Sequence, residues 1–316
     1  MTTLLLVNPR SGMGDGLRLA QAVRAVFRAA GWEVFLGVPP HPQGFTWAAR
    51  WAVRHGVERV IVLGGDGTFR WAAAGLQHTS IPLGILPGGT GNVLARYLKL
   101  PIPGPYRRAS TLQRAAERLL QAQPQGWDLF RVNGALGMLW VGTGLDAAVV
   151  LTVEGQRRGN GRPLVRTWAR FVREALHTLR RWHAADITLQ TDAGPAYWRA
   201  WMLVFANLPL YAGGLIRFPQ GSPQDGQLEV WPLVASSWRQ VLLQAGHALR
   251  EHGWPLTWPW GGRPLREARL RVPPSWPLYC DGDPLPAAQE VHLQVLPRAI
   301  RLLVPPTSTR PSAPRP

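Results

Sequence analysis

The sequence predicts an α/β domain with a parallel sheet, followed by a half that is rich in antiparallel strands. In the first hundred residues, short runs of branched apolar residues alternate with segments in which apolar residues recur at helical spacing. That alternation is typical of a parallel sheet covered by helices on both faces. After Gly126 the helical spacing gives way to alternating apolar and polar residues with turn residues between them, which is the pattern of antiparallel strands.

The elements of the first half can be assigned in order. Strands are expected at residues 3–7, 32–38, 59–63 and 82–86. Helices are expected at residues 17–30, 46–55, 69–76, 92–98 and 110–121. Because ligands of parallel α/β sheets bind beyond the carboxyl ends of the strands, the loops after these strands are the first place to look for a site.

The second half is expected to be rich in strands. Strands are expected at residues 128–132, 136–141, 187–190, 199–206, 227–231, 268–272 and 291–295, the first two joined by an Asn133-Gly134 turn. Helices are expected near residues 163–183 and 237–250. The tail at 305–316 is rich in proline, serine and arginine and is expected to be disordered.

Composition narrows the function classes. No apolar run approaches the ~20 residues that a membrane helix needs, and the N-terminus turns polar too early for a signal peptide, so a cytoplasmic location is expected. A single cysteine, Cys280, excludes a disulfide framework. The formal charge of +17 favours nucleic acid, anionic lipid or phosphorylated small molecules as ligands. Lys99 is the only lysine, which leaves no Walker-type phosphate loop.

Three loops after predicted strands are rich in glycine. They read NPRSGMG at 8–14, LGGDGT at 63–68 and LPGGTGN at 86–92. Glycines let backbone N–H groups turn toward one point, and the N-terminus of the next helix adds positive potential for an anion. One such loop could be an ordinary turn, but three at one edge of one sheet indicate a nucleotide site.

Asp66 stands at the end of a strand among glycines. Thr68 is expected to cap the following helix, which leaves Asp66 to hold Mg²⁺ or to order a phosphate or a hydroxyl group. The alternative is a structural Asx-turn.

The motifs, taken in order, resemble the diacylglycerol kinase catalytic domain family, which includes bacterial soluble lipid kinases, diacylglycerol kinases and sphingosine kinases. The resemblance rests on NPRSG at 8–12, GGDGT at 64–68, PGGTGN at 87–92, GTGLDAAVV at 142–150, YAGG at 211–214, SPQDGQLEV at 222–230 and CDGD at 280–283. GGDGT alone is shared with NAD kinases and phosphofructokinases, whereas the ordered set is specific and spans nearly the whole chain.

The resemblance implies a two-domain organisation. Residues 1–125 would form an ATP-binding domain like that of NAD kinase and phosphofructokinase, completed by a returning strand at 299–304. Residues 126–298 would form the lipid-substrate sandwich, with the active site in the cleft between the domains.

The resemblance also implies site residues, with ATP and Mg²⁺ as cofactors. Asp66 would be central to catalysis, and Asp283 would be the base that takes the proton of the lipid hydroxyl. A metal site would use Asp225 with main-chain oxygens of Ser222 and Gln227. The residues expected to bind ATP are Asn8, Ser11, Gly12, Gly64, Gly65, Asp66, Gly67, Thr68, Gly88, Gly89, Thr90 and Asn92.

The sequence departs from the family pattern near the chemistry. Asp283 stands where glutamate is usual, so the side chain is one methylene shorter. Arg70-Trp71 replaces the usual Asn-Glu pair after GGDGT, and Met13 replaces a lysine whose charge Arg10 could supply. These departures keep a catalytically inactive relative open as an alternative.

The function expected from the resemblance is transfer of the γ-phosphate of ATP to the hydroxyl of diacylglycerol or a related lipid. The alternatives are a soluble-substrate kinase of the NAD kinase type and an inactive relative that binds polyanions or lipids. A basic helix at 162–183 could touch an anionic membrane surface at the inner face, or it could be a solvated arginine face. No nucleic-acid partner is expected, and a homodimer is left open.

Overall fold

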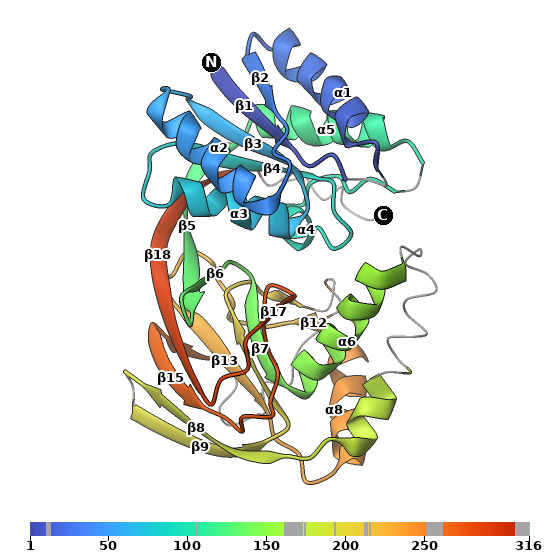
Figure 1. Cartoon of the computed structure of the whole chain (residues 1–316), viewed down its shortest axis with the longest axis vertical. Coiled ribbons are helices and arrows are strands. Elements are labelled where there is room, and N and C mark those ends of the chain that lie inside the picture. Colours follow the sequence, from blue (N-terminus) through green and yellow to red (C-terminus); the bar gives the residue numbers. More distant parts are fainter. Residues whose placement is uncertain are drawn as a thin grey trace, which may run out of the picture. The chain divides into compact units, whose positions relative to one another are not determined.

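The computed structural model describes residues 1–10, 14–104, 106–160, 173, 175–192, 194–211, 214, 216–250 and 262–306. The chain divides into two compact units (Figure 1). The first unit contains Met1–Trp127 and the chain from Ala299 onward, and the second contains Asp128–Arg298. The fold expected from the sequence, a parallel α/β unit and an antiparallel β unit, is confirmed.

The first unit is built on a parallel sheet with the strand order β2-β1-β3-β4-β18. Its strands are β1 Thr2–Val7, β2 Glu33–Gly37, β3 Arg59–Gly64, β4 Pro82–Pro87 and the end of β18 Glu290–Val304. Its helices are α1 Gly16–Ala29, α2 Pro42–Arg54, α3 Asp66–Leu76, α4 Val93–Tyr97 and α5 Arg108–Leu120. Helices α2 and α3 pack together on one face, and α1 and α5 pack together on the other (Figure 1).

The three central strands of this sheet show why the sequence pattern was informative. Almost every residue of β1, β3 and β4 is buried, because helices cover both faces of the sheet. Such strands must be apolar along their whole length. The polar residues and glycines are found in the loops that follow the strands.

The second unit contains two antiparallel sheets around one apolar core. One sheet has the order β14-β13-β10-β7-β16-β17, and in the other β18 pairs with β15, β15 with β8, and β8 with β9. The strands are β5 Gln123–Val132, β6 Ala135–Gly137, β7 Trp140–Gly144, β8 Ala185–Thr191, β9 Gly194–Ala200, β10 Met202–Ala206, β13 Leu228–Leu233, β14 Arg263–Leu265, β15 Glu267–Arg271, β16 Leu278–Cys280 and β17 Asp283–Leu285. Apolar side chains from both sheets, including Phe130, Phe205 and Leu293, fill the core between them.

Two strands expected from the sequence are each broken in the structure. The segment 136–141 divides into β6 and β7, and the segment 199–206 divides into β9 and β10 at Trp201. In both cases the two halves pair in different sheets. The N–H groups of Met138 and Leu139, which lie at the first break, donate to the carboxylate of Asp281 instead of to a strand.

Helix α6 Leu145–Asn160 was not expected from the sequence, whereas α8 Trp238–Arg250 was. Most of the basic helix expected at 162–183 lies outside the described residues; within them, residues 175–181 are helical. The tail beyond residue 306 also lies outside them. Among the helices in the described ranges, none has both the length and the apolar character needed to span a bilayer.

Candidate functional site

The first and second glycine-rich loops are joined through Asn8. Its backbone N–H donates to the carbonyl of Leu63 at 3.0 Å, and its side-chain Nδ2 donates to Oγ1 of Thr68 at 3.0 Å. Its Oδ1 accepts from the N–H of Arg10 at 3.0 Å. The expectation that Thr68 caps the following helix was wrong: α3 already begins at Asp66, so Thr68 lies inside its first turn and bonds to Asn8.

The second and third loops approach each other through glycines. The N–H of Gly88 donates to the carbonyl of Gly64 at 2.8 Å. A Cβ on Gly89 would lie 2.5 Å from the Cα of Gly65, closer than real side chains allow. Only glycine therefore permits this contact, which brings the backbones of two loops together at the carboxyl ends of β3 and β4.

Asp66 bonds to the third loop through both carboxylate oxygens. Oδ2 accepts from the N–H of Val93 at 2.9 Å, and Oδ1 accepts from the N–H of Leu94 at 3.0 Å, so Asp66 caps the start of α4. Burial raises the pKa of this carboxyl, and the two N–H donors oppose that rise. Each oxygen keeps a further lone pair with which it could accept from water or bind a cation.

Asn92 shapes the third loop. It adopts a left-handed conformation with φ of 50°, and its side chain closes on Gly89, accepting from the N–H at 2.8 Å and donating to the carbonyl at 2.6 Å. The side chain of Arg96 donates to the carbonyl of Gly91 at 3.1 Å. The loop is thus held from inside while Gly89, Thr90 and Gly91 remain exposed.

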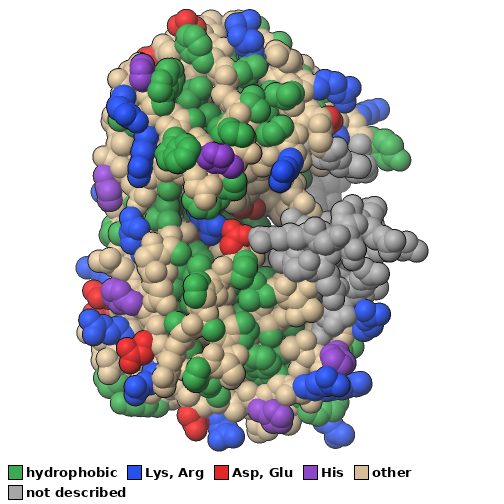
Figure 2. Space-filling model, in the orientation of Figure 1, with side chains coloured by type: hydrophobic (Ala, Val, Ile, Leu, Met, Phe, Trp, Pro, Cys, Tyr) green, Lys and Arg blue, Asp and Glu red, His purple; other side chains and the backbone are tan. Residues whose placement is uncertain are grey.

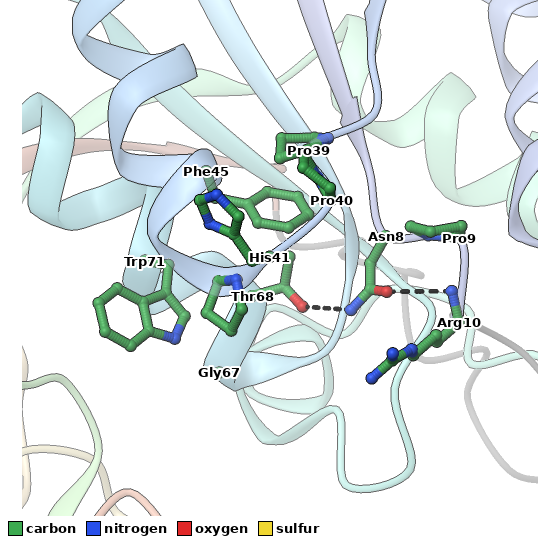
Figure 3. A pocket seen from close by; sticks show the side chains of 11 residues that line it. Asn8, Pro9, Arg10, Pro39, Pro40, His41, Phe45, Gly67, Thr68 and Trp71 are labelled. Carbon is green, nitrogen blue, oxygen red and sulfur yellow. Dashed lines mark hydrogen bonds between the residues drawn. The ribbon is translucent and has the colours of Figure 1, made fainter.

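A pocket of about 220 Å³ lies beside the first two loops (Figure 3). On one side are Asn8 and Arg10, and on the other are the rings of His41, Phe45 and Trp71. Nδ1 of His41 accepts from the N–H of Gly44 at 3.1 Å, so the ring proton of the neutral form is on Nε2. The full lining is Asn8, Pro9, Arg10, Pro39, Pro40, His41, Pro42, Phe45, Gly67, Thr68 and Trp71. A polar side next to glycine loops and a flat aromatic side suit a nucleotide.

Most residues expected to bind ATP therefore lie together in the first unit. They are Asn8, Gly64, Gly65, Asp66, Gly67, Thr68, Gly88, Gly89, Thr90 and Asn92. Ser11 and Gly12 lie outside the described residues. The sequence did not predict the wall of prolines and rings that the β2–α2 connection and the start of α2 supply, although the segment HPQGF at 41–45 contains His41 and Phe45.

Asp283 lies in the second unit, at the start of β17. Strands β16 and β17 form a hairpin in which Cys280 pairs with Asp283 across Asp281 and Gly282. Asp283 is partly exposed.

Comparisons with known proteins agree with this architecture. A model of the diacylglycerol kinase catalytic domain matches residues 2–132, and a model of the YegS C-terminal NAD kinase beta sandwich-like domain matches residues 140–304. A diacylglycerol kinase of Mycobacterium tuberculosis strain CDC 1551 is 31% identical over 245 residues, which are 75% of this chain and 74% of that protein. The chain belongs to the diacylglycerol kinase catalytic domain family.

A solved structure shows the same fold as this family member. A diacylglycerol kinase from Bacillus anthracis has a TM-score of 0.69 over 96% of this chain and 97% of that chain, at 16% identity. At that identity the likeness concerns the fold alone.

The segment expected to bind a metal in this family member brings together the carboxyl groups of Asp128, Asp225 and Glu229. Oδ1 of Asp225 accepts from the N–H of Gln227 at 3.0 Å, and Asp128 and Glu229 are close enough to interact with it electrostatically. Glu229 is 2% exposed, its Oε2 has no hydrogen-bond partner among the described residues, and burial together with Asp225 raises its pKa to about 8. A cation would relieve these costs, so the residues fit one. Since no three His, Cys, Asp or Glu side chains form a ligand set in the described part of the chain, main-chain oxygens such as those of Ser222 and Gln227 would complete the site.

A half-buried carboxylate that sequence reasoning did not single out lies in the second unit. Asp146 accepts hydrogen bonds from the hydroxyls of Tyr211 and, at 2.6 Å, of Tyr279. Burial raises the pKa of Asp146, while the two tyrosines oppose that rise. The signal was available, because the three residues belong to the motifs GTGLDA and YAGG and to the strand before CDGD.

Proposed function

We propose that the protein is an ATP-dependent lipid kinase that transfers the γ-phosphate to the hydroxyl of diacylglycerol or a related lipid. The observation that carries this proposal is the set of three glycine-rich loops joined at one sheet edge, beside a pocket with an aromatic wall. Membership of a family of lipid kinases supports the same assignment.

The first unit supplies the groups that hold the nucleotide. Backbone N–H groups of the exposed third loop would bind phosphate oxygens, and the guanidinium of Arg10 would add positive charge at the polar side of the pocket. Trp71, His41 and Phe45 would pack against the base. Mg²⁺, when bound with ATP, would neutralise charge on the phosphate oxygens.

The second unit supplies the proposed base. The carboxylate of Asp283 takes the proton of the lipid hydroxyl while the hydroxyl oxygen bonds to the γ-phosphorus. The bond between that phosphorus and the ADP oxygen breaks. The products are the phosphorylated lipid and ADP. Asp225, with main-chain oxygens of Ser222 and Gln227, would hold a second cation that stabilises the sandwich.

A panel of lipid alcohols with labelled ATP and Mg²⁺ tests the activity. Diacylglycerol, sphingoid bases and polyprenols are compared with NAD as a soluble acceptor. Transfer of label to one of these lipid alcohols supports the proposal. Formation of NADP without phosphorylation of any lipid would replace it with the NAD kinase alternative. Phosphorylation of none of them, together with salt-sensitive polyanion binding, would favour the inactive relative.

Asp283→Asn tests the base. It should lower kcat by at least about a hundredfold, the lower end of the range for loss of general base catalysis, with the fold intact. Asp186→Asn is the matched control, because Asp186 is exposed and its ion pair with Arg199 is a long surface pair at 3.9 Å. Full activity of Asp283→Asn would remove Asp283 from the mechanism.

We also propose transient contact with an anionic membrane surface at its cytoplasmic face. Basic side chains are spread over the visible face of both units, so net charge alone marks no surface (Figure 2). Helix α8 combines charge with apolar exposure: Leu243 is 75% exposed and Trp238 and Leu242 are 37% exposed, Arg239 and Arg250 are exposed beside them, and the helix has no acidic residue. Such a face suits the boundary between lipid headgroups and acyl chains.

Vesicle sedimentation tests this contact. Leu243→Ser should weaken binding to vesicles that contain phosphatidylglycerol, because it removes apolar area from the helix face. Leu17→Ser, at a leucine of α1 that is 51% exposed, is the control and should leave binding unchanged. Equal binding by both variants would exclude α8 as the membrane surface.

A further inference from the structure

The hairpin that carries Asp283 turns in only two residues. Cys280 pairs with Asp283, so Asp281 and Gly282 form the turn, with φ of 52° and 86°. Both values are positive, as the tight turn between twisted antiparallel strands requires. Asp283 is the first residue after this turn, and its backbone position therefore follows directly from the turn.

The side chain of Asp281 does more than the turn needs. Its Oδ2 accepts from the N–H of Met138 at 2.9 Å, and its Oδ1 accepts from the N–H groups of Leu139 at 2.7 Å and Trp140 at 3.0 Å. Its own N–H donates to the carbonyl of Trp140 at 2.9 Å. Hydrogen bonds to a charged acceptor are stronger than neutral ones, so these bonds tie the turn firmly to the break between β6 and β7.

The two residues before the turn are also held. The hydroxyl of Tyr279 donates to Oδ2 of Asp146 at 2.6 Å. Cys280 is fully buried, and the Cα of Gly137 passes so near that a Cβ there would lie 2.6 Å from Sγ. Tyr279, Cys280 and Asp281 thus all have close neighbours in β6, β7, α6 or the β6–β7 break.

We propose that Asp281 is a positioning residue for the phosphoryl transfer, which holds the hairpin so that the carboxylate of Asp283 stays where the substrate hydroxyl must meet it. The proposal rests on the proposed role of Asp283 as the base. An aspartate has one side-chain torsion fewer than the glutamate usual at this position, so its carboxylate can correct less of any backbone error. A displacement of the turn therefore passes directly to the reacting group.

A matched pair of variants separates positioning from stability. Asp281→Gly keeps a residue that tolerates positive φ and removes the three side-chain bonds. Asn133→Gly does the same at the turn between β5 and β6, where φ is 47° and 83° at Asn133 and Gly134, and where the Asn133 side chain accepts from the N–H of His292 at 2.8 Å. Both substitutions create a Gly-Gly turn in the same unit.

Kinetics and amide exchange supply the readouts. With dioctanoylglycerol in detergent micelles, or the lipid alcohol that the panel selects, Asp281→Gly should lower kcat about 10- to 100-fold and leave KM for ATP within about twofold. Hydrogen exchange should become faster at the amides of Met138, Leu139 and Trp140. Asn133→Gly should change neither kcat nor exchange at these three amides.

Two results would overturn the proposal. One is an unchanged kcat in Asp281→Gly despite faster exchange at residues 138–140. The other is an equal loss of kcat in Asn133→Gly, which would mean that any weakened hairpin in this unit lowers activity. If Asp281→Gly does not fold, Asp281→Asn serves instead, because asparagine tolerates positive φ and keeps one acceptor oxygen; a fall in kcat at constant KM supports the proposal, and wild-type kcat contradicts it.

Asp283→Asn distinguishes this failure from that of the proposed function. An inactive Asp283→Asn with a fully active Asp281→Gly refutes only the positioning role. An active Asp283→Asn refutes the base assignment, and the positioning role with it.

Discussion

Gly65 and Gly89 show how single residues set the shape of the glycine-rich loops. A Cβ on Gly89 would lie 2.5 Å from the Cα of Gly65, and a Cβ on Gly65 would lie 3.1 Å from the Cα of Gly89. Asp66, next to Gly65, accepts from the two N–H groups that follow the third loop. The glycine contact and the Asp66 hydrogen bonds both join the second loop to the third. A substitution at Gly65, Asp66 or Gly89 should therefore change the conformation of both loops.

Gly89→Ala should separate the second and third loops. Its Cβ would lie 2.5 Å from the Cα of Gly65 and 3.2 Å from the nitrogen of the same residue, both backbone atoms. We expect a loss of about 1–3 kcal/mol in the free energy of unfolding, as for other overpacked sites, and weaker ADP binding by calorimetry. Gly104→Ala, with nothing within 4 Å of its Cβ, is the control. Unaltered ADP binding in Gly89→Ala would contradict this account of the loops.

At the scale of elements, Asp146 connects three of them. It lies in the first turn of α6 and accepts from Tyr211 of β11 Leu210–Tyr211 and from Tyr279 of β16. Burial nevertheless raises the pKa of its carboxyl. The junction is therefore most stable when Asp146 is protonated and loses stability as the group ionises.

The stability of the second unit should reflect this ionisation. Because the native pKa of Asp146 is raised, the native state holds its proton at pH values where the unfolded chain has lost it. The free energy of unfolding should then fall as pH rises from about 4, by at most about 1.4 kcal/mol per pH unit. Urea unfolding at several pH values should show that Asp146→Asn lacks this component, since the neutral amide does not titrate.

Asp192→Asn is the control for this measurement. Asp192 is an exposed carboxylate near the turn between β8 and β9, so its replacement should leave the pH profile unchanged. If the free energy of unfolding changed with pH in the same way in Asp146→Asn and in the wild type, ionisation of Asp146 would not destabilise the second unit.

At the scale of the whole molecule, β18 takes part in both units. Residues 290–294 pair with β15, and Arg301 and Leu302 pair with β4. The first unit is therefore completed by residues more than 170 positions beyond Trp127. Its stability should depend on the far end of the chain.

A chain that ends at Arg298 should lose the fold of its first unit. It lacks Ile300, Leu302 and Leu303, which are at most 1% exposed. Burial of three such side chains contributes about 5–9 kcal/mol, comparable with the about 5–15 kcal/mol of a whole domain. A chain that ends at Pro306 keeps the strand and is the control. Calorimetric ADP binding should be lost in the shorter chain and kept in the longer one, and binding by both would contradict the role of β18.

Local sequence pattern predicts the strands of the first unit more closely than those of the second, and the reason is physical. Strands β1, β3 and β4 are buried on both faces and the helices between them are amphipathic, so local pattern alone marks their positions. In the sandwich, the expected strands are interrupted at Met138 and Trp201, and at each interruption the chain passes from one sheet to the other. These breaks depend on partners such as Asp281 and Leu233, which lie far along the chain.

The amino-acid sequence by itself determined the two fold types, the order of the motifs and the glycine loops at the ends of parallel strands, because these follow from local periodicity and from the few residues that permit tight turns. Only the tertiary structure decided that Asp66 caps α4, that Thr68 bonds to Asn8, and that Asp281 fastens the hairpin of Asp283. Such hydrogen bonds join residues 27, 60 and about 140 positions apart, and no local pattern records which distant N–H group a carboxylate will meet.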